Sequence, residues 1–172
     1  LLYDAGQGGL TLLHNLAVLH LFYEDIQAVV FSHGHIDHHG GFFVLEARIP
    51  GPACPVIVHP DIWNVRKVVL QNGHELHMPP PRSSTFKYQR NFKLFEDRNP
   101  SLWFDDCMLV TGEVERTTDF EVGFPGHMMC TDKGDPIWGK PSRWAEDTMV
   151  WDDQAIVLHV RDKGLVILSG CS

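Results

Sequence analysis

The sequence has few cysteines, and none of them belongs to a closely spaced pair. Its 172 residues include four cysteines, at positions 54, 107, 130 and 171. The lack of a C-x-x-C pair argues against a zinc knuckle or a thioredoxin-type site. So few cysteines in a chain of this length also argue against a disulfide framework. We therefore expect reduced, mostly buried cysteines, which fits a cytoplasmic protein.

Positive charge and long apolar runs are also scarce. The chain has 14 Lys and Arg against 22 Asp and Glu, a formal net charge of −8. Surfaces that bind nucleic acid are usually basic, so we expect no nucleic-acid partner. No apolar run approaches the ~18–20 residues of a membrane span, and no signal peptide is visible. A local basic pocket for a small anionic substrate remains compatible with this charge.

The composition is that of one globular domain. Hydrophobic residues make up 44 % and charged residues 21 % of the chain, and this length suits a single domain over residues 1–172. The first residues, LLYDAG, already read as a strand that runs into a turn. We therefore expect the chain to be a piece of a longer protein and the domain to be partial.

Apolar patterning predicts alternating helices and strands early and a hairpin late. Helical spacing or composition predicts helices at 10–20, 41–48 and 61–71, the last with Asp61 as N-cap. β-branched and apolar runs predict strands at 26–32, 55–60 and 107–112, and a hairpin formed by 154–160 and 165–170. Residues 72–104 read as irregular, and residues 119–150 as a long surface excursion. This mixture predicts a layered α/β fold with a mixed sheet.

The densest cluster of chemically active side chains follows the strand predicted at 26–32. It is His33-Gly34-His35-Ile36-Asp37-His38. Imidazole and carboxylate groups are ligands that zinc, iron and manganese accept. His33 and His35, two residues apart, can share one ion, while Asp37 and His38 can turn to a second. The order of these residues at a strand end predicts a metal site rather than a histidine-rich surface loop.

The segment SHGHIDHHGG resembles the H-x-H-x-D-H motif of the metallo-β-lactamase superfamily, and LLYDAGQGG is similar to its first aspartate-glycine turn. Together, DAGQGGLTLLHN, VTGEVERTTDFE, WDDQAIVLHV and LVILSGCS resemble its dihydropterin-phosphate synthase-like branch. The resemblance implies an αβ/βα sandwich of four layers, incomplete at both ends. It implies His33 and His35 on a first metal, and Asp37 and His38 on a second. It also implies a further histidine ligand directly after GCS, where this sequence stops.

Three further pairs of residues lie where a substrate or a metal could be contacted. Asp152 and Asp153 precede a strand of the hairpin and could bind a metal, orient a ligand or simply form a turn. Glu113 and Arg116 follow a strand end, where an arginine suits an anionic substrate, although a surface salt bridge is the alternative. His59 and His127 are further candidates for lining the site. His39, in contrast, is interpreted as a structural residue.

The resemblance implies a metal-dependent enzyme with a divalent cofactor, two Zn²⁺ or else Fe or Mn. A metal-activated water would hydrolyse an electrophilic substrate, with Asp37 orienting the nucleophile. The branch also suggests metal-assisted condensation of a pterin with a phosphorylated small molecule. Two alternatives stay open: a non-catalytic, decayed metal-binding domain, and a di-iron enzyme that uses oxygen. Metal identity would separate the second from a zinc hydrolase.

Overall fold

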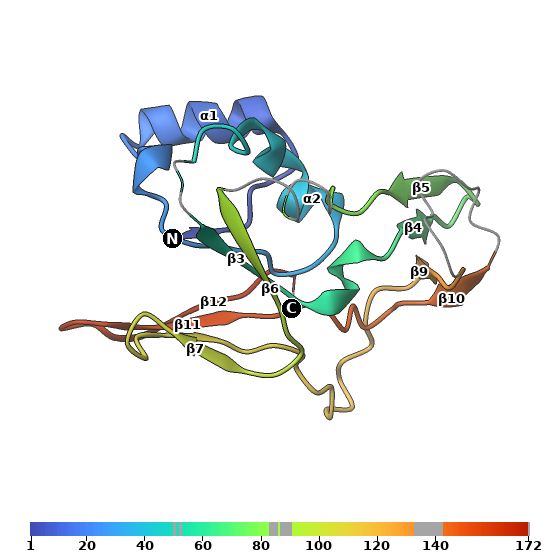
Figure 1. Cartoon of the computed structure of the whole chain (residues 1–172). Coiled ribbons are helices and arrows are strands. Elements are labelled where there is room, and N and C mark those ends of the chain that lie inside the picture. The colour runs from blue at the N-terminus through green and yellow to red at the C-terminus, as the bar shows by residue number, and fades with distance from the viewer. Residues whose placement is uncertain (50, 52, 83–85, 87–90, 133–142, 172) are drawn as a thin grey trace.

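A parallel sheet lies at the centre of the fold, which a computed structural model describes for residues 1–49, 51, 53–82, 86, 91–132 and 143–171. In spatial order its strands are β1 (Leu2–Tyr3), β2 (Val29–Val30), β3 (Cys54–Val58) and β6 (Phe92–Glu96). All neighbouring strands pair in parallel. Helix α1 (Gly9–Val18) lies over one face of this sheet (Figure 1).

Both faces of the parallel sheet are buried, because successive side chains of a strand point to opposite sides. Val29 and Val56 pack in a core beneath α1, where Leu12 and Leu16 of the helix contact it. Val30 and the other face of the sheet belong to a second core, shared with the sheet below. The sheet is therefore the middle layer of three.

The lower layer is an antiparallel sheet (Figure 1). In spatial order its strands are β12 (Gly164–Leu168), β11 (Ile156–Val160), β8 (Met108–Val110) and β7 (Ser101–Trp103). The predicted hairpin is confirmed as β11 and β12, which pair from Ile156 with Leu168 to Val160 with Gly164. Its turn needs positive φ at Asp162 and at Gly164, a conformation in which glycine is not strained.

A third sheet lies to one side and is antiparallel. Its strands, in order, are β10 (Trp144–Glu146), β9 (His127–Cys130), β4 (Arg66–Val69) and β5 (Glu75–Met78). β9 and β10 occupy the predicted surface excursion, of which residues 133–142 lie outside the described residues. Parallel and antiparallel pairing thus both occur, as predicted, but in separate sheets.

The helix predicted at 61–71 is wrong. The chain forms a short 3-10 turn, η3 (Pro60–Trp63), and then strand β4. β4 pairs with β5 on one side and with β9 on the other, so long-range pairing overrides local helical spacing. Asp61 is not the cap: it donates its backbone N–H to His59, whose side chain caps η3.

The remaining helical turns are short. η1 (Tyr23–Asp25) precedes β2, and α2 (Ile36–His39) follows it. α2 continues into a 3-10 turn, η2 (Gly40–Val44), so the helix predicted at 41–48 is only partly correct. Within the described residues, no helix combines the length and the apolar character needed to cross a membrane.

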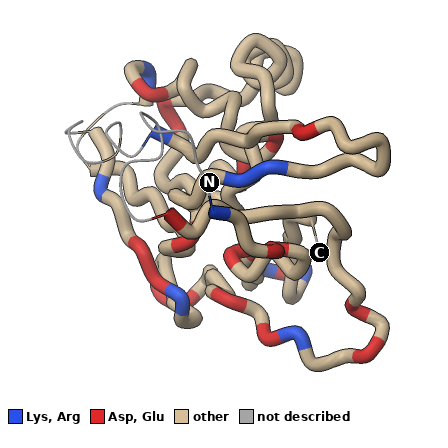
Figure 2. Tube along the Cα trace, turned by 90° about the vertical axis from the view of Figure 1, so that its right-hand side faces the viewer, with Lys and Arg blue, Asp and Glu red and all other residues tan. Residues whose placement is uncertain are grey.

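The four cysteines are all free, but only two are buried, so the prediction that they are mostly buried is wrong for the others. Cys107 and Cys171 are exposed. Figure 2 shows acidic and basic residues interspersed along the coloured trace. The absence of a nucleic-acid partner stays a prediction.

Candidate metal centre

The histidine cluster lies where β2 ends and α2 begins. Residues 31–35 leave the central sheet as a buried loop, and α2 starts at Ile36. Segments far away in the sequence reach the same place. Asp4 follows β1, and Asp152 and Asp153 precede β11. Cys171 follows β12, so four separate segments meet at this edge of the fold.

Three side chains converge tightly enough to hold one ion. Nitrogen atoms of His33 and His35 and the Sγ of Cys171 all lie within 4.8 Å of one another. His33 Nε2 and His35 Nδ1 are 2.9 Å apart, and both histidines are buried. Two imidazoles and a thiolate form a ligand set that zinc accepts.

A buried histidine nitrogen without a hydrogen-bond partner supports the binding of a cation by this group. His35 Nε2 is buried and has no hydrogen-bond partner among the described residues. An unpaired buried polar atom is costly, and native structures rarely keep one without a reason such as an ion. The structure thus brings His33 and His35 together, and their predicted binding of one shared ion stays a prediction.

His38 lies beside this trio and joins it to β1. Its ring centroid is 4.1 Å from that of His33. His38 Nδ1 lies 2.7 Å from Asp4 Oδ2, and His38 Nε2 lies 3.2 Å from Cys171 Sγ. Asp4 also accepts hydrogen bonds from the backbone N–H and the hydroxyl of Ser32. Asp4 is thus positioned to orient the His38 ring, as carboxylates orient metal-binding histidines elsewhere.

The cluster strongly perturbs its own protonation. Burial lowers the pKa of His33, but hydrogen bonds to Asp153 and Cys171 outweigh it and raise the pKa to about 9. In His38 burial is again outweighed, by Asp4 and Cys171, and the pKa rises to about 10. Burial and the charge on His33 lower the pKa of His35 to about 2. Hydrogen bonds from His33 and His38 lower the pKa of Cys171 to about 7, which favours the thiolate.

Asp37 does not join the converging trio. Its side chain is 60 % exposed, and its Oδ2 lies 3.7 Å from His38 Nε2. The carboxylate therefore borders the cluster on the solvent side. Its predicted roles, as a ligand of a second metal and as the group that orients the nucleophile, stay predictions.

Asp152 holds the loop of residues 31–35 through a hydrogen bond to its backbone. Its Oδ2 accepts the backbone N–H of Gly34 at 2.8 Å, between the two histidines His33 and His35. Its Oδ1 accepts from Arg66 Nη2 at 2.8 Å, while Arg66 Nε donates to Asp147 at 2.7 Å. All three charged side chains are almost fully buried. A Cβ on Gly34 would collide with this guanidinium, so the loop and Arg66 fit closely.

Asp153 faces the histidines, and Arg116 approaches it. Asp153 Oδ1 lies 3.4 Å from His33 Nδ1, and its Oδ2 lies 3.9 Å from Arg116 Nη2. Arg116 also pairs with Glu121 at 3.0 Å, and its side chain is only 13 % exposed. The structure thus brings Arg116 to the edge of the histidine cluster, where a cation suits an anionic group.

The other predicted substrate residues separate into two places. His59 lies 3.2 Å from Glu113, and both contact Arg98, which also binds Asp61. His127, from β9, stacks on His35 with ring centroids 5.0 Å apart. His127 therefore borders the histidine cluster, whereas the described polar contacts of His59 and Glu113 form a separate network. Substrate contact by these residues stays a prediction.

Sequence reasoning missed Asp4, Arg66, Asp147 and Cys171. Asp4 stands in the YDAG turn, and Cys171 in the GCS segment, and both segments were noticed for their resemblance rather than for their side chains. Arg66 was missed because the incorrect helix prediction for residues 61–71 did not place it on a buried strand. The run VRKVVL, rich in β-branched residues, could have indicated a strand with a buried arginine.

Comparison with known proteins agrees with this geometry. The family model of the metallo-beta-lactamase superfamily matches residues 1–165. The chain is 31 % identical over 177 residues to the 7,8-dihydropterin-6-methyl-4-(beta-D-ribofuranosyl)-aminobenzene-5'-phosphate synthase of Methanocaldococcus jannaschii, covering 100 % of this chain and 55 % of that protein.

Two solved structures share the fold. One is Tm1679, described as a metal-dependent hydrolase of the beta-lactamase superfamily, with a TM-score of 0.67 and 20 % identity over 99 % of this chain and 55 % of that one. The other is a HARLDQ-motif mutant of a metallo-beta-lactamase from Cronobacter sakazakii, with a TM-score of 0.51 and 16 % identity over 97 % of this chain and 51 % of that one.

The fold and the histidine cluster therefore define a metallo-beta-lactamase-type α/β sandwich. The chain belongs to the metallo-beta-lactamase superfamily, since the family model covers nearly all of it. It spans about half the length of the curated relative it matches. Membership supports an enzyme that binds metal, as predicted.

Proposed function

We propose that this chain carries the metal-binding residues of a hydrolase that uses one or two divalent cations, zinc in the first place. The observation that carries the proposal is the convergence of His33, His35 and Cys171, with His35 Nε2 left without a partner among the described residues. The thiolate of Cys171 favours zinc over the hard cations magnesium and calcium. A bound divalent cation would supply a Lewis acid and lower the pKa of water toward neutrality.

The protein side chains around this centre have distinct tasks in the proposal. Asp4 holds the His38 ring through a 2.7 Å contact, and Asp152 holds the loop at Gly34. Asp37, exposed at the rim, would complete a second metal site with His38 and orient the attacking water. Arg116, at the edge of the cluster, would bind the anionic part of a small-molecule substrate.

A direct test is hydrolysis of bis(p-nitrophenyl) phosphate and of p-nitrophenyl acetate by protein reconstituted with zinc or manganese. Asp37→Asn keeps the shape of the side chain but removes the charge, so we expect kcat to fall by about 10²–10⁴-fold. Asp105→Asn is the matched control, because Asp105 is also exposed and lies in the turn between β7 and β8, which belongs to another part of the sequence than the histidine cluster. Equal rates in the two variants would contradict the role of Asp37.

Condensation of a pterin with a ribofuranosyl-aminobenzene phosphate is the second candidate function. The 31 % identity to a protein with that synthase name favours it. A product that forms only when both precursors are present, with no turnover of the esters, would favour this function. Metal binding without turnover of any substrate would favour the non-catalytic alternative. Bound iron with redox-dependent spectra would favour the di-iron alternative.

A further inference from the structure

Helix α1 presents an exposed ridge on the side that faces away from the parallel sheet. Leu10, His14 and Val18 follow one another at intervals of four residues, so their side chains form one row along the helix, called here the α1 ridge. Leu10 is 82 % and Val18 60 % exposed, and His14 is exposed as well. Figure 1 shows α1 as the outermost element on this side of the fold. Single exposed apolar residues are ordinary, but several on one helix face point to a contact.

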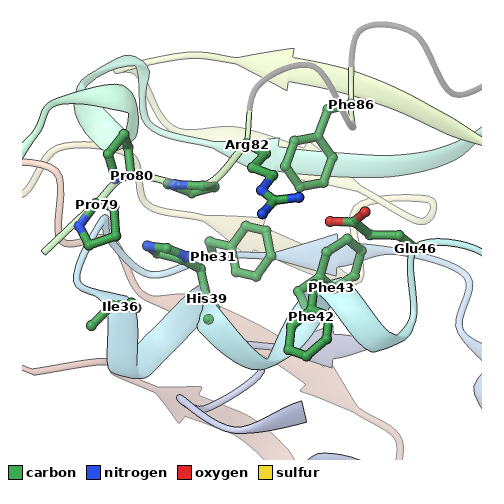
Figure 3. A pocket seen from close by; sticks show the side chains of 12 residues that line it. Phe31, Ile36, His39, Phe42, Phe43, Glu46, Pro79, Pro80, Arg82 and Phe86 are labelled. Atoms are coloured by element: carbon green, nitrogen blue, oxygen red, sulfur yellow. The ribbon is translucent and has the colours of Figure 1, made fainter. Parts of the chain in front are cut away.

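The opposite side of α1 is already packed against the protein. Leu12 and Leu16 contact the core above the parallel sheet. Gly9 lies so close to η2 that a Cβ there would be 3.0 Å from the Phe43 ring, which Figure 3 shows beside Phe42. The helix is therefore apolar on two sides, and packing within the chain accounts for only one of them.

The exposed apolar surface extends past the end of the helix. Leu19, Leu21 and Phe22 are 65 %, 55 % and 64 % exposed. The backbone N–H of Leu19 donates to the carbonyl of Asn15, and that of Leu21 donates to the carbonyl of Leu16. These hydrogen bonds hold the segment against the last turn of α1. The ridge and this segment together expose five large apolar side chains in one region.

This region carries no charged side chain. Residues 5–23 contain no Asp, Glu, Lys or Arg, although the whole chain has a formal net charge of −8. Two copies of such a surface can meet without burying a charge and without repulsion between like charges. A membrane surface suits it less well, because helices that lie on membranes carry Lys and Arg beside their apolar face. The charges that follow here, Glu24 and Asp25, are acidic.

The α1 ridge is complementary to itself. His14 stands midway between Leu10 and Val18 in the sequence. In an antiparallel pair of helices with a twofold axis near His14, Leu10 of each copy therefore meets Val18 of the other. Such a contact uses the same surface on both copies and closes on itself, as most homodimer interfaces do.

We propose that α1 is a dimerisation surface on which a second copy of this chain packs in the antiparallel orientation. Burying the five apolar side chains and their polar neighbours in both copies would remove roughly 1,000 Å² of surface from water. That area is about the least that a specific interface needs. The dimer is therefore weak and reversible, with a Kd on the order of 10–100 µM.

Analytical ultracentrifugation over a range of concentrations, with a reductant and EDTA present, tests the proposal. The parent chain of 19.5 kDa should sediment as a monomer at ~1 µM and mostly as a species of twice that mass at ~500 µM. Leu10→Glu and Val18→Lys should each weaken the dimer by at least about tenfold, because each would bury a charge against an apolar side chain. Leu165→Glu and Val122→Lys are the matched controls, since these residues are 70 % and 79 % exposed outside α1, and both should leave dimerisation unchanged.

A mixture of the two helix variants tests the antiparallel arrangement. In a heterodimer of Leu10→Glu with Val18→Lys, the introduced opposite charges face each other, so the mixture should dimerise more tightly than either variant alone. No such rescue would overturn the antiparallel arrangement, because a parallel pair does not bring these two positions together.

Three results would overturn the dimer itself. They are a parent chain that stays monomeric up to ~500 µM, a dimer that both helix variants retain, and a dimer that Leu165→Glu dissociates. A parent chain that stays monomeric but sediments with phosphatidylcholine vesicles would assign the α1 ridge to lipid instead. Because EDTA is present throughout, each result is independent of the proposed metal centre.

Discussion

Replacing Arg66 by alanine should lower the free energy of unfolding by about 3–5 kcal/mol. The guanidinium donates to Asp147 at 2.7 Å and to Asp152 at 2.8 Å. Side-chain exposure is 1 % for Arg66, 4 % for Asp147 and 0 % for Asp152. The substitution would leave two buried carboxylates without their cation, and such unpaired charges are strongly destabilising.

Arg98 provides a matched control. It also pairs with two carboxylates, those of Asp61 and Glu113, at 2.6 and 3.0 Å. Its side chain, however, is 50 % exposed, so solvent screens both pairs. Arg98→Ala should therefore cost no more than about 1 kcal/mol.

Urea titration of the two variants and the parent protein measures the difference directly. A loss of about 3–5 kcal/mol in Arg66→Ala corresponds to a fall in Tm on the order of 6–20 °C. If Arg66→Ala and Arg98→Ala lose the same small amount, the reasoning from burial is refuted. Arg66→Met keeps apolar volume at this position but removes the charge. If Arg66→Ala is destabilised and Arg66→Met is not, packing volume rather than the ion pairs stabilises the fold, and the reasoning from the ion pairs is contradicted.

Three further predictions concern the same region. Gly34→Ala should cost about 1–3 kcal/mol of stability in urea titration, because the added Cβ would collide with Arg66 and with the backbone of Ile62; an unchanged midpoint would contradict the close fit. Burial lowers the pKa of His39 to about 4 from its ordinary 6.5, so the unfolded state binds more protons between these values. The contribution of His39 to the free energy of unfolding is therefore complete above pH ~6.5 and falls by about 3 kcal/mol as the pH drops to ~4. In a pH series of urea titrations, the free energy of unfolding of His39→Gln should fall less steeply over this range. Cys171→Ser should weaken zinc binding, measured by competition with a chromogenic chelator, by at least about tenfold; unchanged affinity would remove the thiolate from the ligand set.

The local sequence pattern predicted those strands and the hairpin whose own residues show a clear β-strand pattern. The hairpin at β11 and β12 and the buried strand β3 follow from alternating or continuous β-branched residues. The structure of segment 61–71 did not follow from its local pattern, because its apolar spacing fits a helix and a strand equally well. The pairing of β4 with β5 and β9 decides between them, and that pairing is not local.

The histidine cluster was visible in the sequence because its residues are neighbours in the chain. Asp4 and Cys171 were not, because they lie in segments far from the histidines in the sequence, whereas Asp152 was predicted as a residue that could bind a metal or orient a ligand. The interpretation of His39 as structural also needed the fold. Only the folded structure shows that its Nε2 is buried without a hydrogen-bond partner among the described residues.

The metal content of the protein tests the central claim most directly. Elemental analysis of parent protein grown with zinc should find at least about one equivalent, and about two if the second site fills. His35→Ala should lose that metal, because His35 offers an unpaired nitrogen to it. His77→Ala, which alters a histidine that is 58 % exposed on β5, should retain it. Full zinc content in His35→Ala, or almost none in the parent protein, would contradict the assignment of this cluster as a metal centre.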